Sequence, residues 1–322
     1  MATKERKMPP ILSVSGESLP EAWENACIEL ADKGMVYSRR DPEDNKAQVE
    51  AYMTIEVRNP DADPFSHLKG GTNALDAPLL DYYLEIMGSK NTWVRDFNNP
   101  EDTRWDYMYH ERLSEYPDQK NPDRKIDQVK FAIDRLIESP CSRRTNIITW
   151  YPERDMLASH TPCLQRIWFQ IIAPQGEEDW ALDMHYNFRS RNVMDASFGN
   201  MHGLYMLGCH VRDGVEKATG KSLAMRMIDN IDSFHVNSRS YARFIHIVQG
   251  LEEAKRAGES LSERCWNRKE VVDGLKVARE EVIGATLKQT RQHFPGDMAA
   301  EEKRVNDIAD RVFYLLDKYA PK

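Results

Sequence analysis

The sequence predicts an α+β fold in which a central mixed or antiparallel sheet is flanked by helices. Between residues 145 and 234, runs rich in β-branched residues follow one another at short intervals. Before and after this block, apolar residues recur at helical spacing, and no internal repeat interrupts the chain. We therefore expect a polar tail over residues 1–18 and a single domain over residues 19–322, with a helical C-terminal region from about residue 250.

The N-terminal third is predicted to contain two helices and one strand. A serine and a proline open the first helix near residue 18, and a glycine closes it at residue 34. Residues 49–57 alternate between apolar and polar, as a half-buried strand does. Residues 79–87 are helical, with Gly88 suited to the position after the last turn. The aromatic residues between 93 and 116 follow no period, which favours packed irregular structure.

The middle of the chain supplies most of the predicted strands. A helix over residues 125–138 ends at Pro140. Strands follow at residues 145–150, 164–172 and 180–188, with a hairpin turn at residues 174–176. The remaining predictions are a buried helix at 200–211, mixed strand and turn at 222–234, and helical periodicity around 271–282 and 308–315.

Composition limits the class of protein. The net charge of −8 argues against a protein that coats nucleic acid. The five cysteines are an odd number, widely spread and without a CxxC pair, which indicates a reducing compartment and neither a disulfide framework nor a metal site. The charged N-terminal ten residues do not resemble a secretory signal, and no apolar run approaches the ~20 residues that span a bilayer. We expect a soluble cytoplasmic protein without a membrane or nucleic-acid partner.

One cysteine lies among arginines in the strand-rich block. A free cysteine is most often a small buried hydrophobic residue. Cys163, however, follows Thr-Pro and is preceded by Arg143-Arg144 and followed by Arg189 and Arg191. Cations favour the thiolate, which is the nucleophilic form of cysteine. A cysteine hydrolase remains an alternative, with a base among His160, His185, His202 and His210.

The arginines form two groups, each at the end of a predicted strand or helix. Arg143-Arg144 follows the helix that ends at Pro140, and Arg189-Ser190 follows a strand. Isolated arginine pairs are usually surface charge. Guanidinium groups together with a hydroxyl, however, match the oxygens of a phosphate monoester. Two such groups around one cysteine favour an anionic substrate.

Together these motifs resemble the thymidylate synthase and pyrimidine nucleotide hydroxymethylase superfamily. The resemblance rests on five blocks: Ser142-Arg143-Arg144, Pro162-Cys163, residues 187–190 (NFRS), residues 199–205 (GNMHGLY) and residues 232–239 (DSFHVNSR). The last block is most similar to that of deoxycytidylate hydroxymethylase. The resemblance is good over residues 139–243, weak in the N-terminal third and slight in the last eighty residues. It implies the thymidylate synthase-like form of the α+β fold.

The resemblance also implies a covalent mechanism. Cys163 would attack C6 of a pyrimidine nucleoside monophosphate, which makes C5 nucleophilic toward the one-carbon unit of 5,10-methylenetetrahydrofolate. Arg189 and Ser190 would bind the phosphate within the subunit. Arg143 and Arg144 would reach it from the partner subunit of a homodimer. No metal is implied.

Further site residues follow from the same resemblance. Either Arg39 or Arg40 would add another phosphate contact. Asn200 would bind the base edge, and His235 the sugar hydroxyl.

Three asparagines mark where the chain is unusual. Asn192 stands where the family has an aspartate that contacts the pterin of folate. Asn237 replaces the tyrosine that joins His235 on the sugar, so that ribose and deoxyribose both remain open. Asn200 stands where thymidylate synthases have asparagine and deoxycytidylate hydroxymethylases have aspartate. Since an amide both donates and accepts, it suits the uracil edge, although cytosine remains open.

The product is the last open question. The family uses a helical glutamate to organise water, and both Asp81 and Glu85 are candidates for that role. The sequence ends in Tyr-Ala-Pro-Lys and does not show the apolar tail that closes over folate in typical synthases. We therefore expect a one-carbon transferase that makes a 5-hydroxymethyl product. The alternatives are a thymidylate synthase and a nucleotide-binding relative without folate chemistry.

Overall fold

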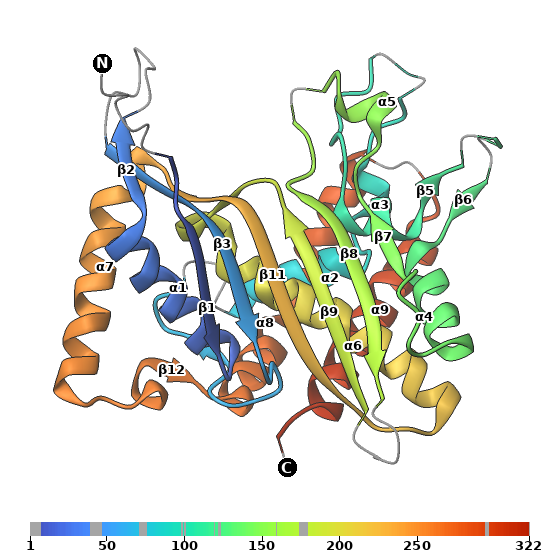
Figure 1. The fold of residues 1–322 in the computed structure, drawn as a ribbon. Coiled ribbons are helices and arrows are strands. Elements are labelled where there is room, and N and C mark those ends of the chain that lie inside the picture. The colour runs from blue at the N-terminus through green and yellow to red at the C-terminus, as the bar shows by residue number, and fades with distance from the viewer. Residues whose placement is uncertain are drawn as a thin grey trace.

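The computed structural model describes residues 8–38, 47–70, 76–97, 99, 101–118, 120–121, 124–158, 160–173, 180–293 and 296–321 (Figure 1). The principal helices are α1 (Leu19–Lys33), α2 (Asp76–Ile86), α3 (Tyr109–Ser114), α4 (Gln128–Glu138), α5 (Pro152–Asp155), α6 (Phe198–Thr219), α7 (Ser238–Ala257), α8 (Arg268–His293) and α9 (Met298–Lys318). Shorter helical turns are η2 (Asn91–Trp93), η3 (Val193–Ser197) and η4 (Leu261–Arg264).

A mixed sheet forms the centre of the molecule. Its order is β1 (Ile11–Gly16), β3 (Ala47–Val57), β11 (Leu223–Val236), β9 (Trp180–Phe188), β8 (Leu164–Ile172) and β7 (Asn146–Ile148), with β2 (Met35–Ser38) paired to β3 and β10 (Arg191–Asn192) paired to β11. The pairs β1–β3 and β9–β11 are parallel, whereas β3–β11, β8–β9 and β7–β8 are antiparallel. Two small ribbons complete the strands: β4 (Ser66–His67) with β12 (Cys265–Trp266), and β5 (Tyr116–Pro117) with β6 (Lys125–Ile126).

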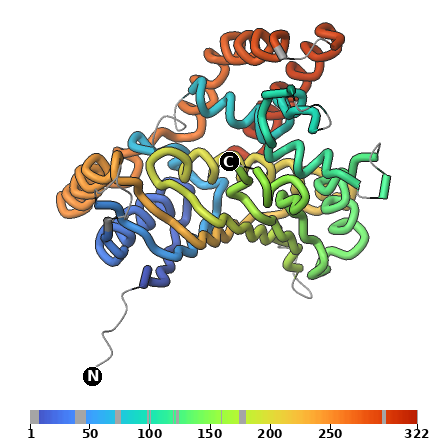
Figure 2. Tube along the Cα trace, turned by 90° about the horizontal axis from the view of Figure 1, so that it is seen from above, coloured from blue at the N-terminus to red at the C-terminus, as the bar shows by residue number. Residues whose placement is uncertain are grey.

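The helices cover one face of this sheet. Figure 2, seen along the edge of the sheet, shows α8 and α9 stacked beyond α2 and α6 on that side. The buried side chains of β3, β8, β9 and β11 point into this layer and form the hydrophobic core with α1, α2 and α6. On the opposite face, side chains such as Arg166, Ile172 and Arg226 remain exposed. The sheet is therefore one-sided within a single chain.

Most of the predicted elements are confirmed. The helix that begins after Ser18, the strand at 49–57 and the helix at 125–138 are present as α1, β3 and α4. Gly88 follows α2 with a φ of 104°, a left-handed conformation that favours glycine. The strands predicted at 164–172 and 180–188 are β8 and β9, while the turn predicted at 174–176 lies outside the described residues.

Two predictions about the chain need correction. The polar tail was expected to reach residue 18, but Ile11–Gly16 is strand β1 and pairs in parallel with β3. Its polar residues alternate with Leu12 and Val14, because a strand at the sheet edge buries only one face. The segment predicted as mixed strand and turn at 222–234 is the continuous strand β11, bent by a register shift between Ile231 and Phe234.

The helical C-terminal region ends in a hairpin of α8 and α9 that packs on α2 and its following turn. Trp93 donates its indole N–H to Thr290 Oγ1 at 2.8 Å, and Arg304 donates to the carbonyl groups of Gly88 and Ser89. In the described part of the chain, none of the helices combines the length and apolar character needed to cross a bilayer.

Candidate active site

Several of the predicted site residues, though not all, lie at one end of the sheet. Leu164, the first residue of β8, pairs with Phe188, the last residue of β9. Cys163 and Arg189 are their immediate neighbours in sequence and therefore lie side by side. β10 brings Asn192 next to His235 near the end of β11. The strand ends thus explain why Arg189 lies beside Cys163 and His235 beside Asn192, although the members of each pair are far apart in the sequence.

Arg189 holds the turn that carries the cysteine. Its backbone N–H donates to the carbonyl of Cys163 at 2.9 Å, and its Nε donates to the carbonyl of Pro162 at 3.1 Å. Its Nη2 donates to the carbonyl and to the hydroxyl of Thr161 at 2.9 and 2.8 Å. Cys163 is partly exposed, and the guanidinium beside it is exposed. A cation is thus fixed on the turn that carries a partly exposed cysteine.

Two tyrosines form the other side of this turn. The Tyr109 hydroxyl accepts the N–H of Leu164 at 3.4 Å, and the Tyr107 hydroxyl donates to the carbonyl of Thr161 at 3.4 Å. Burial, with Cys163 close by, raises the pKa of Tyr107 to about 12. Burial raises the pKa of Tyr109 as well. Both hydroxyls therefore stay protonated near neutral pH and offer hydrogen bonds to whatever binds beside the cysteine.

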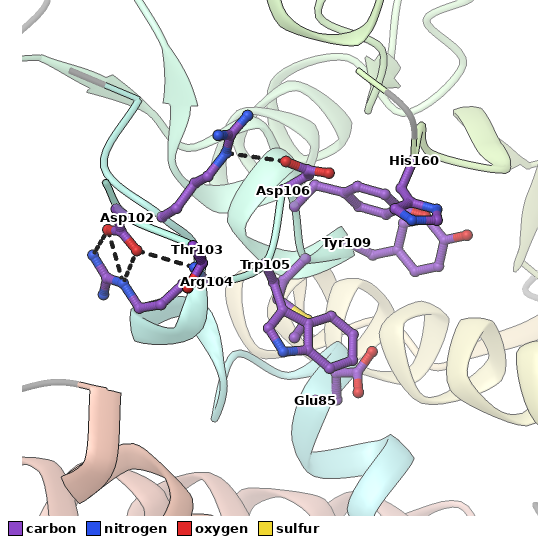
Figure 3. A pocket seen from close by; sticks show the side chains of 11 residues that line it. Glu85, Asp102, Thr103, Arg104, Trp105, Asp106, Tyr109 and His160 are labelled. Carbon is purple, nitrogen blue, oxygen red and sulfur yellow. Dashed lines mark hydrogen bonds and ion pairs between the residues drawn. The ribbon is translucent and has the colours of Figure 1, made fainter. Parts of the chain in front are cut away.

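The tyrosines border a cavity of about 690 Å³. Figure 3 shows the side chains of Glu85, Trp105, Tyr109 and His160 around it. The remaining lining residues are Arg95, Asp102, Thr103, Arg104, Asp106, Tyr107 and Met108. The guanidinium groups of Arg95 and Arg104 form ion pairs with Asp106 and Asp102 at 3.0 and 2.6 Å. Most of the wall therefore comes from the aromatic segment between α2 and α3.

The cavity distinguishes the two acidic candidates on α2. Glu85 lines it and has a side chain 20% exposed, whereas the Asp81 side chain is 43% exposed and is not part of its wall. Lys90, whose side chain is 7% exposed, donates to Asp81 at 2.7 Å and to Glu85 at 3.1 Å. Burial raises the pKa of Glu85, although Lys90 acts against the shift. Of the two residues, Glu85 is the one placed to act on a bound molecule.

Asn192 and Asn200 flank the π-helical turn η3. Asn192 caps this turn: its Oδ1 accepts the N–H of Met194 at 2.9 Å, and its Nδ2 donates to Asp195 at 2.9 Å. π-turns inside helices are frequent at functional sites. Asn200 lies one turn further on, in α6, and donates to the hydroxyl of Tyr82 at 2.6 Å.

His235 and Asn237 lie at the end of β11, on the same side of the molecule. His235 Nδ1 contacts the carbonyl and the hydroxyl of Ser233 at 3.1 and 3.4 Å. Asn237 precedes α7 and forms no side-chain cap bond with it. Both side chains are partly exposed, and both remain predictions as sugar contacts.

Arg143 and Arg144 lie elsewhere in the same chain. Their turn runs beside the middle of β8, where Phe169 donates its N–H to the carbonyl of Thr145 at 2.9 Å. Phe169 is six residues from Cys163, about 20 Å along a strand that rises about 3.3 Å per residue. Both arginines are exposed. Arg39 and Arg40, the other predicted phosphate contacts, lie outside the described residues.

Arg191 is not part of the site's accessible positive charge. It is buried, forms an ion pair with Asp229, which is also buried, and lies over the ring of Phe188 at 3.7 Å. The expectation that four arginines surround the cysteine is therefore wrong for this one. Its place in β10 turns the side chain into the core, where it needs a carboxylate partner.

The histidines do not form a dyad with the cysteine. Within the described residues, no hydrogen bond joins a histidine to Cys163, although His160 lines the cavity. His202 is buried against Tyr83, and burial lowers its pKa to about 3. His185 pairs with Asp183 on the open face of the sheet, and His210 contacts Arg311. This geometry gives no support to a cysteine hydrolase.

Sequence reasoning missed several residues that border the site. Tyr82, Trp105, Tyr107 and Tyr109 either line the cavity or contact a predicted residue. Their density was visible in the sequence. These aromatic residues follow neither a helical nor a strand period that would indicate which side chains face the site. The segment from 93 to 109 is largely irregular, and the fold sets its contacts.

Comparisons with known proteins agree with this arrangement. Residues 83–249 match the family model described as thymidylate synthase, a span that includes the cysteine turn, both arginine groups and Asn200. A protein of Methanosarcina acetivorans is 29% identical over 242 residues, covering 74% of this chain and 95% of that protein. One of Methanopyrus kandleri is 30% identical, covering 65% and 88%, and one of Methanococcoides burtonii is 28% identical, covering 52% and 85%. All three carry the name "Putative thymidylate synthase". The family match covers more than half of the sequence, and the chain therefore belongs to the thymidylate synthase family.

Proposed function

We propose that this protein transfers a one-carbon unit from 5,10-methylenetetrahydrofolate to C5 of a pyrimidine nucleoside monophosphate and releases a 5-hydroxymethyl nucleotide. The observation that carries the proposal is the cysteine turn. The turn that carries Cys163 is held by three side-chain hydrogen bonds from Arg189 to Thr161 and Pro162. Tyr107 and Tyr109, which bond to the same turn, line a cavity with a carboxylate, Glu85, in its wall.

The nucleotide is bound and activated by groups at the sheet end. One guanidinium nitrogen of Arg189, Nη1, forms no hydrogen bond with the described part of the chain, and Ser190 follows Arg189 in sequence. A phosphate held there places the pyrimidine near Cys163, and such orientation can supply several kcal/mol of barrier lowering. The thiolate adds to C6, which gives C5 the character of a carbanion. Loss of the C5 proton and departure of the thiolate later restore the aromatic ring.

The cavity suits the folate co-substrate. Trp105, 53% exposed, presents an aromatic surface, and the carboxylates of Glu85 and Asp106 offer acceptors. A pterin is a flat ring with several hydrogen-bond donors, so it matches both features. When bound, methylenetetrahydrofolate supplies a carbon at the oxidation level of formaldehyde. Asn192, the predicted pterin contact, uses its amide to cap η3. We therefore assign the contact with the pterin to the residues of the cavity wall.

Water completes the proposed reaction. Addition of one water to the transferred methylene gives the hydroxymethyl group, and tetrahydrofolate leaves without being oxidised. Glu85 is placed to orient that water through its carboxylate. The chain's last described residues do not close the cavity, since Tyr319 lies against Arg212 with its hydroxyl on Glu216. Arg212 donates to the carbonyl of Leu223, the first residue of β11, which pairs with the start of β9 and so lies far from Cys163.

A homodimer supplies the second arginine group. Arg143 and Arg144 lie about 20 Å from the Cys163 of their own chain, next to a sheet face that its own helices leave open. Packing two such faces against each other would bring the pair toward the partner's nucleotide site. A face-to-face dimer thus supports the phosphate contact in trans.

Thymidylate synthesis is the second candidate, favoured by the names of the relatives and by Asn200. The two reactions differ in the fate of the folate. A synthase reduces the transferred carbon with a hydride from the folate and leaves dihydrofolate, whereas a hydroxymethylase leaves tetrahydrofolate.

One incubation separates these functions. The protein is mixed with methylenetetrahydrofolate and equal amounts of UMP, CMP, dUMP and dCMP, and products are identified by mass with dihydrofolate followed by absorbance. We expect one nucleotide to gain a hydroxymethyl group without dihydrofolate. A methylated product with dihydrofolate would establish the synthase. Nucleotide binding without any product would indicate a relative that has lost folate chemistry.

A further inference from the structure

Among the described residues, Tyr82 is the one side chain that forms a hydrogen bond with the Asn200 side chain. The Asn200 amide meets the Tyr82 hydroxyl at 2.6 Å, a contact between α6 and α2. The hydroxyl forms no other hydrogen bond within the described part of the chain. Both side chains are partly buried, and Tyr82 lies three positions before the cavity-lining Glu85. The contact therefore joins Asn200, the predicted base-binding residue, to α2, the helix that carries Glu85.

The fold makes room for this contact. A Cβ placed on Gly203 would come within 2.4 Å of Tyr82 Cε1, so only glycine lets the tyrosine ring lie against α6. Gly203 is one turn after Asn200, and η3 ends immediately before α6. Glycine, the π-turn and the tyrosine together fix where the amide of Asn200 lies.

A phenol hydroxyl can pair with either end of an amide. It donates one proton and also accepts, so it can bind the nitrogen or the oxygen of Asn200 by rotating its own proton. Burial raises the pKa of Tyr82, which keeps that proton in place. The hydroxyl therefore holds the amide in position without deciding which end faces the substrate.

Building on the proposed function, we propose that Tyr82 is a positioning residue that holds the Asn200 amide for base recognition and lets it accept uracil and cytosine nucleotides alike. Uracil presents an acceptor at O4 and a donor at N3, whereas cytosine presents a donor at N4 and an acceptor at N3. The two patterns are related by exchanging the ends of the amide, and the Tyr82 hydroxyl can follow that exchange.

Calorimetric titration of the full-length protein with UMP, CMP, dUMP and dCMP tests this. With the preferred sugar, we expect the uracil and cytosine nucleotides to bind within about tenfold of each other. Tyr82→Phe should weaken both by a similar factor of about 2 to 10, the loss of one neutral hydrogen bond. Gly203→Ala, which displaces the ring but keeps the hydroxyl, should act in the same direction.

Tyr83→Phe is the matched control. Tyr83 is the next residue of α2, and its hydroxyl also bridges to α6, meeting His202 Nδ1 at 2.8 Å, but this pair is buried in the core. We expect Tyr83→Phe to lower the melting temperature at least as much as Tyr82→Phe while leaving nucleotide affinity unchanged. Equal effects of both variants on affinity would mean that Tyr82 acts only by supporting the helix pair.

A double-mutant cycle and a charge change give the decisive readouts. In an Asn200→Ala background, Tyr82→Phe should no longer change nucleotide affinity, and an undiminished effect would overturn the proposal. Asn200→Asp removes the donor end, so it should move the preference toward cytosine by about tenfold or more. A wild-type protein that binds one base more than 100-fold better would refute the dual recognition. If the wild type binds none of the four nucleotides, the proposed function fails instead.

Discussion

The two walls of the site are built in different ways. The sheet-end wall, formed by the 161–164 turn and Arg189-Ser190, is held by contacts between the adjacent strands β8 and β9. The helix wall, formed by α2 and the Gly88–Trp93 turn, depends on α8 and α9, more than 190 residues away in sequence. The first wall carries an exposed arginine, whereas the second carries two partly exposed carboxylates, Asp81 and Glu85, paired to the nearly buried Lys90.

This difference assigns different tasks to the two walls. An exposed arginine beside an accessible cysteine suits binding and covalent activation of an anion. A carboxylate whose pKa is raised by burial, and which is fixed by a nearly buried lysine, suits the handling of water or protons. Substitutions in the first wall should remove chemistry or phosphate binding, and those in the second should lower the rate while nucleotides still bind.

Cys163→Ser should have the largest effect. We expect turnover to fall by roughly 10³-fold or more, about 4 kcal/mol of barrier, because a serine hydroxyl is far less ionised than a thiol. Nucleotide affinity should stay within about threefold, since Arg189 holds this turn through backbone carbonyls that remain in place. Rates are measured by product mass and affinity by calorimetry. Retained turnover would refute the assignment of the nucleophile.

Glu85→Gln should be next in size. Loss of a group that acts on protons or water typically costs 10²- to 10⁴-fold, so we expect kcat to fall by about 10²-fold with KM for the nucleotide little changed. Asp81→Asn is the matched control on the same helix, with the same lysine partner but outside the cavity wall. It should lower kcat by less than about tenfold. If Asp81→Asn lowered kcat more than Glu85→Gln, Asp81 would be the residue that orients the water.

The pH dependence of kcat follows from the same residue. Burial raises the pKa of Glu85, so its carboxylate becomes protonated at a higher pH than an ordinary glutamate. If the ionised form orients water, kcat falls as the pH drops through that raised pKa. We therefore expect an acidic limb above the usual range of glutamate, which Glu85→Gln removes. A limb that persists in the variant would come from another group.

The sequence predicted the sheet-end wall well. Arginine, serine and cysteine motifs lie close to strand ends whose β-branched pattern is clear, so their meeting follows from sheet geometry. Arg191 shows the limit of that reasoning. It follows Arg189 by only two positions, but it lies in β10, where its side chain turns into the core against Asp229.

The helix wall could not be predicted in the same way. The choice between Asp81 and Glu85 depends on which side of α2 faces the cavity, and both lie on the same general face of an isolated helix. The ion pairs of Lys90 with Asp81 and Glu85 and the contact of Tyr82 with Asn200 are tertiary or turn contacts that no sequence pattern specifies. The packing of α8 and α9 on this region is a tertiary contact that helical periodicity alone does not specify.

Arg304→Met should give the smallest effect and tests that long-range support. Arg304 binds the carbonyl groups of Gly88 and Ser89, and it pairs with Glu301, which accepts from Thr92 at 3.3 Å. Without it, the turn that carries Lys90 loses its anchor, so Glu85 is held less firmly. We expect kcat to fall by about 3- to 10-fold, with nucleotide affinity unchanged, measured by steady-state kinetics and calorimetry.

Arg279→Met separates this effect from a general loss of stability. Arg279 also joins α8 to α9, through Asp310 at 2.7 Å, but does not contact the turn after α2. We expect it to lower the melting temperature slightly and leave kcat unchanged. If both variants lower kcat equally, the hairpin supports the whole fold and does not position the acid. If only Arg304→Met lowers kcat, then α9, which lies outside the residues matched by the family model, helps to position Glu85.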